Sequence, residues 1–240
     1  MLTRPLAQSG GAAAALAKLG ARVAFCPLIK VVPPRSWKPL DAGIRLLSSY
    51  DAVAFTSVNA VDFFFLRCRK ILGRVPAAPS VVAAVGPATA KAVAAHGWRC
   101  SVIPEDARAA GLARILRVPR GSRVLIPRAE RGLTTLAQGL RKNGAKVTSV
   151  PAYRTVPDET GLRALRLALI DGADAVLFAS GSAAAVGARD TRLAGAAAIA
   201  IGPTTAAALR SHGIKPAAIA KKPDAASFAR AAADGLKGRT

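Results

Sequence analysis

The sequence contains an internal duplication, and this feature restricts the possible folds more than any other. Four short blocks occur in the same order in both halves of the chain: Leu2–Pro5 matches Leu125–Arg128, Leu19–Val23 matches Asn143–Val147, Asp51–Ser57 matches Asp174–Ser180, and Ala84–Ala90 matches Ala200–Ala206. A repeat that keeps its order over several blocks indicates two copies of one supersecondary pattern. The chain is therefore predicted to form two related lobes.

Each half alternates short apolar runs with helical patterns. The apolar runs are typical of strands buried on both faces of a parallel sheet, and they are Ala52–Phe55, Val81–Val85, Val124–Ile126, Ala175–Phe178 and Ala197–Ile201. Helices are predicted over Ala12–Leu19, Leu133–Lys142, a segment that runs from an Asp106 N-cap to Arg117, and Ala225–Leu236. Almost no strand is expected at the start, because only three residues precede Arg4. This alternation predicts α/β lobes with doubly wound parallel sheets, of the flavodoxin or Rossmann-like class.

Two proline-flanked extended segments indicate where the chain passes between the lobes. Phe25–Pro33 and Ser149–Pro157 carry prolines at the same two positions, and proline disfavours helix at the residue before it. We therefore expect a first lobe that is discontinuous in sequence, a second lobe inserted into it, and two linkers: residues 1–33 plus 157–240, residues 36–150, and linkers near 33–36 and 150–157. A cleft between the lobes is the expected ligand site.

The charge of the chain indicates what kinds of partner it could have, and its cysteines indicate its location. The chain has 35 Lys and Arg against 13 Asp and Glu, which gives a net charge of +22 and favours an anionic partner such as nucleic acid, acidic lipid or a polycarboxylate. The basic residues are dispersed, however, as they would also be on an ordinary solvated surface. Three widely spaced cysteines give neither a disulfide framework nor a metal-binding pair, so a cytoplasmic location is expected. No apolar run reaches the roughly 20 residues that cross a bilayer.

Two repeated glycine–proline motifs are predicted anion sites. Gly86-Pro87-Ala88-Thr89 and Gly202-Pro203-Thr204-Thr205 each follow a predicted strand and begin a helix. Proline suits the first helical position, glycine lets a ligand approach the backbone, and threonine adds a hydroxyl beside free N–H groups that bind carboxylate or phosphate. The same residues also make a plain helix start, and this alternative stays open. The candidates are Gly86, Thr89, Gly202, Thr204 and Thr205.

Further polar candidates follow other predicted strands. Ser57 and Asn59 follow one strand, and Ser180 and Ser182 follow its counterpart. N-capping of the next helix is the alternative role, and it is expected for at least one residue of each pair. Arg4 and Arg128 come directly after strands, where a guanidinium can bind a carboxylate through two hydrogen bonds. For any single arginine in so basic a chain, a surface role is an equal alternative.

The sequence offers no obvious imidazole or metal-based catalyst. His96 and His212 are repeat-related and come just before glycines at predicted helix ends, so a structural role is expected for both. HExxH, CxxC, GxGxxG, P-loop and GxSxG patterns are absent, so no metal or nucleotide cofactor is expected. Tyr153 stands in the second connector where the first has Ile29, so only the second connector carries a proton donor.

These motifs together resemble the uroporphyrinogen-III synthase (HemD) family over essentially the whole chain. The resemblance rests on Thr3–Pro5, Phe55–Val61, Val85–Ala90, Pro151–Thr155 and Ala200–Ala206, of which the last two are the most specific. Two departures stand out. Val58 replaces a proline that the family often has, and Arg128–Gly132 changes the order of the family's arginine–glycine pattern, which affects the expected role of Arg131.

The resemblance implies a cofactor-free lyase that acts on a small molecule. Its substrate would be hydroxymethylbilane, a linear tetrapyrrole with eight carboxylates, closed with loss of water and inversion of the last pyrrole to give uroporphyrinogen III in heme biosynthesis. Tyr153 would protonate the departing hydroxyl, as a weak general acid of modest effect. An azafulvene and then a spiro intermediate would follow. The other candidate residues would hold the acetates and propionates, and the protein would be a monomer without nucleic-acid or membrane partners.

Two alternatives belong to other functional classes. A two-lobed protein that binds a small anion without turnover would share the helix-start anion sites but would not need Tyr153. A basic nucleic-acid-binding protein would show an affinity that falls steeply with salt, although no known reading element is present in the sequence.

Overall fold

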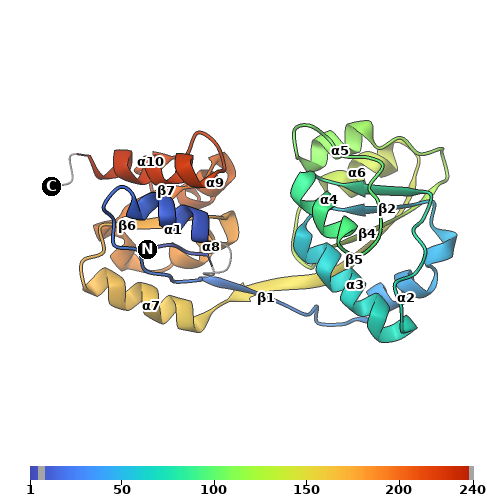
Figure 1. The fold of residues 1–240 in the computed structure, drawn as a ribbon, viewed down its shortest axis with the longest axis horizontal. Coiled ribbons are helices and arrows are strands. Elements are labelled where there is room, and N and C mark those ends of the chain that lie inside the picture. The colour runs from blue at the N-terminus through green and yellow to red at the C-terminus, as the bar shows by residue number, and fades with distance from the viewer. Residues whose placement is uncertain (5–8, 238–240) are drawn as a thin grey trace. The chain divides into compact units, whose positions relative to one another are not determined.

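The computed structural model describes residues 1–4 and 9–237, so Pro5 of the predicted Thr3–Pro5 motif lies outside the described residues. The chain divides into two compact units, Met1–Lys30 with Val156–Thr240 and Val31–Thr155. In each unit a parallel sheet lies between layers of helices, as Figure 1 shows. The α/β fold class predicted from the alternating pattern is confirmed.

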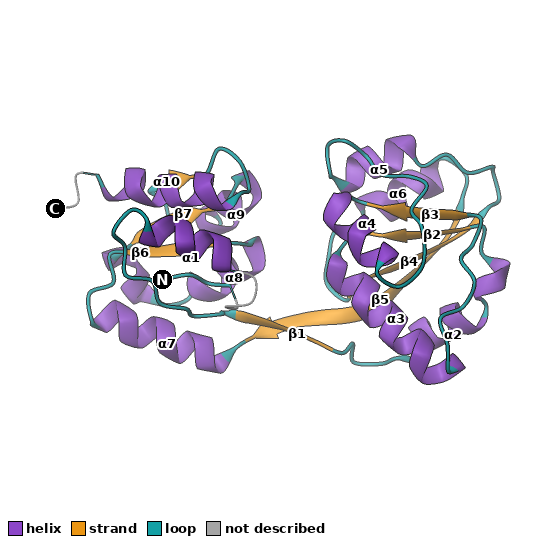
Figure 2. Ribbon diagram, viewed as in Figure 1, coloured by secondary structure: helices purple, strands orange, loops and turns teal. Residues whose placement is uncertain are grey.

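The sheet that carries the Val31–Thr155 unit has five strands, drawn in Figure 2. In spatial order they are β1 (Ile29–Val32), β5 (Lys146–Pro157), β4 (Arg123–Ala129), β2 (Ala52–Phe55) and β3 (Val81–Ala84). β3, β2, β4 and β5 are parallel to one another. Their carboxyl ends therefore meet at one edge of the sheet.

Alternating residues of these strands enter two separate cores. Val53 and Phe55 pack with α2 (Lys38–Arg45), α3 (Val58–Leu72) and α4 (Pro87–Ala94) on one face. Ala52 and Ala54 pack with α5 (Ala109–Ile115) and α6 (Thr135–Lys142) on the other. Because successive side chains of a strand point to opposite faces, a strand that is apolar throughout needs helices on both sides.

The other unit repeats this plan with a smaller sheet. β6 (Ala175–Phe178), β7 (Ala197–Ala200) and β8 (Ala218–Ile219) lie side by side. Leu2 forms bridges to Phe25 and to Leu177, which is the whole contribution of the first described residues to strand pairing. Three helices cover one face of this sheet: α7 (Glu159–Ile170), α8 (Gly181–Gly187) and α9 (Pro203–Arg210). The other face is covered by α1 (Gly10–Ala17) and α10 (Ala225–Leu236), which lie near the two ends of the chain.

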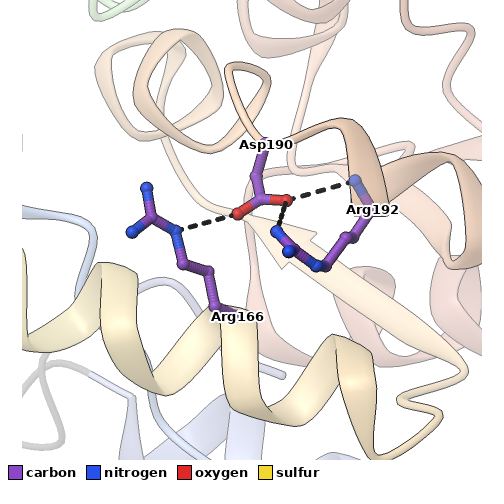
Figure 3. Close-up of polar contacts among 3 residues, drawn as sticks. All are labelled: Arg166, Asp190 and Arg192. Carbon is purple, nitrogen blue, oxygen red and sulfur yellow. Dashed lines mark hydrogen bonds and ion pairs between the residues drawn. The ribbon is translucent and has the colours of Figure 1, made fainter.

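A buried carboxylate joins two elements of this unit (Figure 3). Asp190 precedes the short 3-10 helix η3 (Thr191–Gly195) and accepts a hydrogen bond from the Arg192 amide at 3.1 Å. Its carboxylate also pairs with the Arg192 guanidinium at 3.3 Å and with Arg166 of α7 at 3.1 Å. Burial raises the pKa of Asp190, but these hydrogen bonds outweigh that effect and hold the pKa below its ordinary value.

Most predicted elements are present, but β3, β7, α1, α6 and the end of α5 differ from their predicted bounds by one or two residues, and two further details differ. β2, β6 and α10 have the predicted bounds. β4 is longer than Val124–Ile126, so Arg128 lies within the strand rather than after it. The predicted Asp106 N-cap is wrong, because α5 begins after Arg108 and no side chain caps it. The Asp106 carboxylate instead accepts hydrogen bonds from the Arg108 amide at 3.3 Å and from the Arg114 guanidinium at 2.9 Å.

The two histidines lie just beyond the ends of their helices. The His96 ring packs against Phe65 with centroids 4.5 Å apart, and its Nδ1 is 3.0 Å from an Arg69 nitrogen. The Nδ1 of His212 is 3.0 Å from the Ala208 carbonyl near the end of α9. Both sets of contacts agree with the structural role predicted for these residues.

Candidate functional site

Most of the predicted site residues in the Val31–Thr155 unit lie along the carboxyl edge of its sheet. Ser57 and Asn59 follow β2, and Gly86 and Thr89 follow β3. The remaining two predicted residues are on the neighbouring strands, Arg128 near the end of β4 and Tyr153 in β5. The parallel order β5, β4, β2, β3 brings them to one edge.

Tyr153 and Ser57 form a direct hydroxyl pair at this edge. The Tyr153 hydroxyl is 3.1 Å from Ser57 Oγ. β4 separates their strands, and the β4 residue that pairs with Tyr153 is Ala129. Because Ala129 has only a methyl side chain, the tyrosine can reach across β4 to the serine.

The tyrosine ring is held firmly in place. Its ring stacks on Phe63 of α3 with centroids 6.1 Å apart and an interplanar angle of 20°. The Tyr153 carbonyl accepts a hydrogen bond from the Glu130 amide at 2.7 Å. Only 8% of the residue is exposed. The phenol is therefore a nearly buried group whose hydroxyl position is fixed from several sides.

Arg128 is a half-buried guanidinium with a fixed orientation. Its Nε donates to Ser149 Oγ at 2.8 Å, and one terminal nitrogen donates to the Ala129 carbonyl at 2.9 Å. The neighbouring Glu130 carboxylate pairs with Arg35 instead, at 3.5 Å. Within residues 1–4 and 9–237, no carboxylate lies within ion-pair distance of Arg128. Its charge is thus available to an external anion.

The glycine–proline motifs have nearly identical geometry in the two units. Gly86 and Gly202 are both extended, and proline occupies the first turn of α4 and of α9. Neither helix has a side-chain cap or an acidic residue in its first turn. The free N–H groups and the positive end of each helix dipole therefore remain available to an anion.

Thr89 and Thr205 occupy equivalent places in these motifs. Their exposed fractions are only 4% and 3%. Neither hydroxyl makes a hydrogen bond to any described part of the chain. The described residues contain no fully enclosed side-chain oxygen without a partner, so both hydroxyls keep a small opening to solvent. Thr204, one residue before Thr205, is exposed.

The remaining candidates lie in the unit that contains the chain start. Ser180 caps α8 by accepting from the Ala183 amide at 3.1 Å, just as Ser57 caps α3 by accepting from Ala60 at 3.2 Å. The predicted N-capping role is thus confirmed for both serines. Ser182 is exposed in the first turn of α8. Arg4 is also exposed and lines a cavity of about 70 Å³ together with Asp224.

Sequence reasoning missed the residues that support the candidates. Phe63 fixes the tyrosine ring, Ser149 orients Arg128, and Ala129 makes room between Tyr153 and Ser57. Ser149 could have been noticed as a polar residue within an apolar strand. Nothing in the pattern distinguishes Phe63 from a core aromatic residue.

The described residues offer few other reactive groups. Burial raises the pKa of the Cys68 thiol to about 12 and that of Cys26 to about 11, so neither provides a thiolate at neutral pH. No group of three or more His, Cys, Asp or Glu in the described ranges is placed to hold a metal ion. The groups at the β-sheet edges that can bind a ligand or donate a proton are hydroxyls, backbone amides and guanidinium groups.

Comparisons with known proteins point to one family. The family model HEM4, described as uroporphyrinogen-III synthase HemD, matches residues 11–230. Over 175 residues the chain is 35% identical to the uroporphyrinogen-III synthase of Synechococcus elongatus, covering 70% of this chain and 66% of that protein, just under two thirds of its length. It is 28% identical over 252 residues to the uroporphyrinogen-III synthase of Chlorobaculum parvum, covering 99% of this chain and 98% of that protein.

Solved structures show the same fold. A mutant uroporphyrinogen III synthase from the extremely thermophilic bacterium Thermus thermophilus matches 98% of this chain and 97% of its own, with a TM-score of 0.67 and 22% identity. The uroporphyrinogen-III synthetase of Helicobacter pylori matches 88% of this chain and 93% of its own, with a TM-score of 0.60 and 21% identity. At these identities the likeness supports the two-lobed α/β architecture.

Proposed function

Because the chain belongs to the uroporphyrinogen-III synthase HemD family, we propose that it converts hydroxymethylbilane to uroporphyrinogen III with loss of water and inversion of the terminal pyrrole. The observation that carries the proposal is the placement of Tyr153. Its fixed hydroxyl lies at the same sheet edge as an unneutralised guanidinium and the uncapped start of α4. A linear tetrapyrrole with many carboxylates and a leaving hydroxyl needs such a combination.

The two kinds of group have separate roles in this proposal. Tyr153 is the catalytic residue and protonates the departing hydroxyl. The substrate carboxylates are bound by guanidinium groups, by hydroxyl and amide side chains, and by backbone amides at helix starts. The residues proposed for this are Arg4, Ser57, Asn59, Gly86, Thr89, Arg128, Ser180, Ser182, Gly202, Thr204 and Thr205.

The chemistry requires positioning more than covalent help from the protein. When the C–O bond breaks, its electron pair leaves with the oxygen, and the phenol proton completes a water molecule. The pyrrole nitrogen supplies electrons to the resulting azafulvenium. The substituted carbon of the last ring attacks it, the spiro intermediate rearranges, and a ring carbon finally releases a proton that restores the phenol. Holding the bilane so that the substituted carbon reacts first is a positioning effect.

The expected setting follows from the same family. We propose a small-molecule substrate, no nucleic-acid or membrane partner, a monomeric state and a cytoplasmic location. In the portion that the structure describes, no helix combines the length and apolar character needed to cross a membrane.

The decisive experiment resolves the isomers of the product. Purified protein is incubated with fresh hydroxymethylbilane, and the oxidised products are separated into types I and III. We expect excess type III over a protein-free control. Tight binding of the bilane with only type I product would instead favour a binding protein without turnover.

A Tyr153→Phe variant tests the assigned donor. It should lower kcat by about 10- to 100-fold, because a weak general acid contributes at the low end of such effects, while KM changes little. The matched control is Tyr50→Phe. Tyr50 is the only other tyrosine, is 6% exposed and packs in the core near Arg123. Wild-type turnover by Tyr153→Phe would remove the residue from the mechanism.

A further inference from the structure

Ser57 is hydrogen-bonded on two sides. Its Oγ accepts from the Ala60 amide in the first turn of α3 at 3.2 Å, and it lies 3.1 Å from the Tyr153 hydroxyl. A serine hydroxyl has one proton and two lone pairs. The amide uses one lone pair, so the proton and the second lone pair remain for the tyrosine.

The arrangement of donors favours one direction for the bond between the two hydroxyls. If the phenol donated to Ser57, the serine proton would have no acceptor among the described residues. If Ser57 donates to the phenol oxygen, its proton is satisfied, and the phenol proton is left for a ligand. This direction also builds a chain from amide to serine to phenol in which each donor strengthens the next.

The helix start adds a favourable field for a phenol that loses its proton. α3 has 15 residues and no acidic side chain in its first turn, so the positive end of its dipole lies beside Ser57. A phenolate oxygen would receive a charge-assisted hydrogen bond from the serine, which is stronger than a neutral one. The donor is already in place before the proton leaves, as preorganised stabilisation requires.

From these observations we propose that Ser57 is a positioning residue for Tyr153. Its hydroxyl, oriented by the N-terminus of α3, donates to the phenol oxygen and directs the phenol proton toward the substrate hydroxyl. The inference rests on the proposed function and revises it at one residue: it replaces the carboxylate-binding role proposed for Ser57 above with a role exerted through Tyr153.

Three substitutions separate this role from N-capping. Ser57→Ala removes both hydrogen bonds and should lower kcat about tenfold with KM within about twofold. Ser57→Thr retains both and should restore most of kcat. Ser57→Asp caps the helix well but presents only acceptors, so it draws the phenol proton inward. We expect Ser57→Asp to unfold at the wild-type temperature and to lose at least as much kcat as Ser57→Ala.

A control measures what the loss of a cap costs by itself. Ser180 caps α8 with almost the same backbone angles as Ser57, and no tyrosine lies against it among the described residues. The change in unfolding temperature for Ser180→Ala therefore calibrates the change for Ser57→Ala. If Ser57→Asp retains the wild-type kcat, the only role of Ser57 is to cap α3, and the proposal is overturned.

A double-mutant cycle tests whether Ser57 works through Tyr153. In a Tyr153→Phe background, Ser57→Ala should cause no further loss of kcat, because the group that it positions is gone. A full additional tenfold loss, or a loss expressed mainly in KM, would return Ser57 to the role of substrate ligand and contradict the inference.

A spectroscopic measurement tests the hydrogen bond without turnover. The tyrosine Raman doublet reports whether a phenol accepts or donates a hydrogen bond. The chain has two tyrosines, so in a Tyr50→Phe background the doublet arises from Tyr153 alone. Ser57→Ala should change the doublet, and an unchanged doublet would overturn the inference. Absence of type III product from the wild type would defeat the proposed function instead, so the two failures are distinguishable.

Discussion

Thr89 and Thr205 are buried threonines whose hydroxyls make no hydrogen bond within the described ranges. Because each hydroxyl has only a small opening to solvent, it contributes little to stability in the free protein and can form a full hydrogen bond when a ligand binds. Thr89→Val and Thr205→Val should therefore each raise KM about three- to tenfold and leave stability unchanged or up to about 1 kcal/mol higher, since valine and threonine have similar helix propensity. Steady-state kinetics and denaturant unfolding of the same samples test both effects.

Thr3 is the matched control for these substitutions, because it is equally buried but bonded. Its hydroxyl donates to the Leu177 carbonyl at 2.9 Å and accepts from the Ala179 amide at 3.4 Å. Thr3→Val should lose about 1 to 2 kcal/mol of stability. An equal loss in Thr89→Val would mean that the Thr89 hydroxyl serves the fold instead of a ligand.

The sequence indicated the candidate residues but not how they are connected. Ser57 was predicted from its position after a strand, and Tyr153 from its place in a connector. Their contact joins residues 96 positions apart and depends on β5 and β2 flanking β4. The local sequence does not indicate that β5 and β2 flank β4. It also does not indicate the rotamer with which Arg128 reaches Ser149.

At the scale of elements, Asp190 links η3 to α7 through two arginines (Figure 3). Its pKa is lowered in the folded state, so the carboxylate contributes stability above its unfolded pKa of about 3.9 and loses it as the pH falls through the folded pKa. Asp190→Asn keeps an acceptor for the η3 cap but removes the charge. We expect a lower unfolding temperature than wild type at pH 7 and a difference that narrows below about pH 4.

The control for this prediction is Asp234→Asn. Asp234 pairs with Lys237 at 2.7 Å on an exposed surface, where solvent and salt screen the interaction. It should unfold like the wild type across the same pH range. A difference between Asp190→Asn and wild type that stayed constant from pH 7 to about pH 3 would show that shape, not charge, holds η3 to α7.

Element boundaries were predictable where burial alone decides them. β2 and β6 match the predicted residues because every side chain in them is apolar and buried. The sequence indicates β5 only as an extended connector, since the residues at both of its ends are partly or fully exposed and do not form an apolar run. The start of α5 was misplaced because Asp106, a good capping residue, is engaged by Arg114 instead. A side chain with two possible partners cannot be assigned from local sequence.

At the scale of the whole molecule, the duplication predicted repeated α/β architecture, but not the strand order. The order β1, β5, β4, β2, β3 results from pairings between segments far apart in the chain. The sequence also left the meaning of the net charge of +22 open between a solvated surface and attraction of an anionic ligand. Kinetics can separate these two meanings.

If the charge attracts the proposed polycarboxylate substrate, association should weaken as salt screens it. The Debye length falls from roughly 20 Å to about 6 Å between about 20 and 300 mM salt, so kcat/KM should fall about tenfold while kcat stays within about twofold.

A comparison of potassium chloride with potassium sulfate at equal ionic strength separates screening from competition. Sulfate is expected to bind also at uncapped helix starts such as those of α4 and α9. A further rise in KM with sulfate would show direct competition at the anion sites proposed here, the helix starts and Arg128. If kcat/KM does not change with ionic strength, the 35 basic residues form an ordinary solvated surface. Salt must weaken any electrostatic field that attracts the substrate, so a constant kcat/KM would contradict such a field.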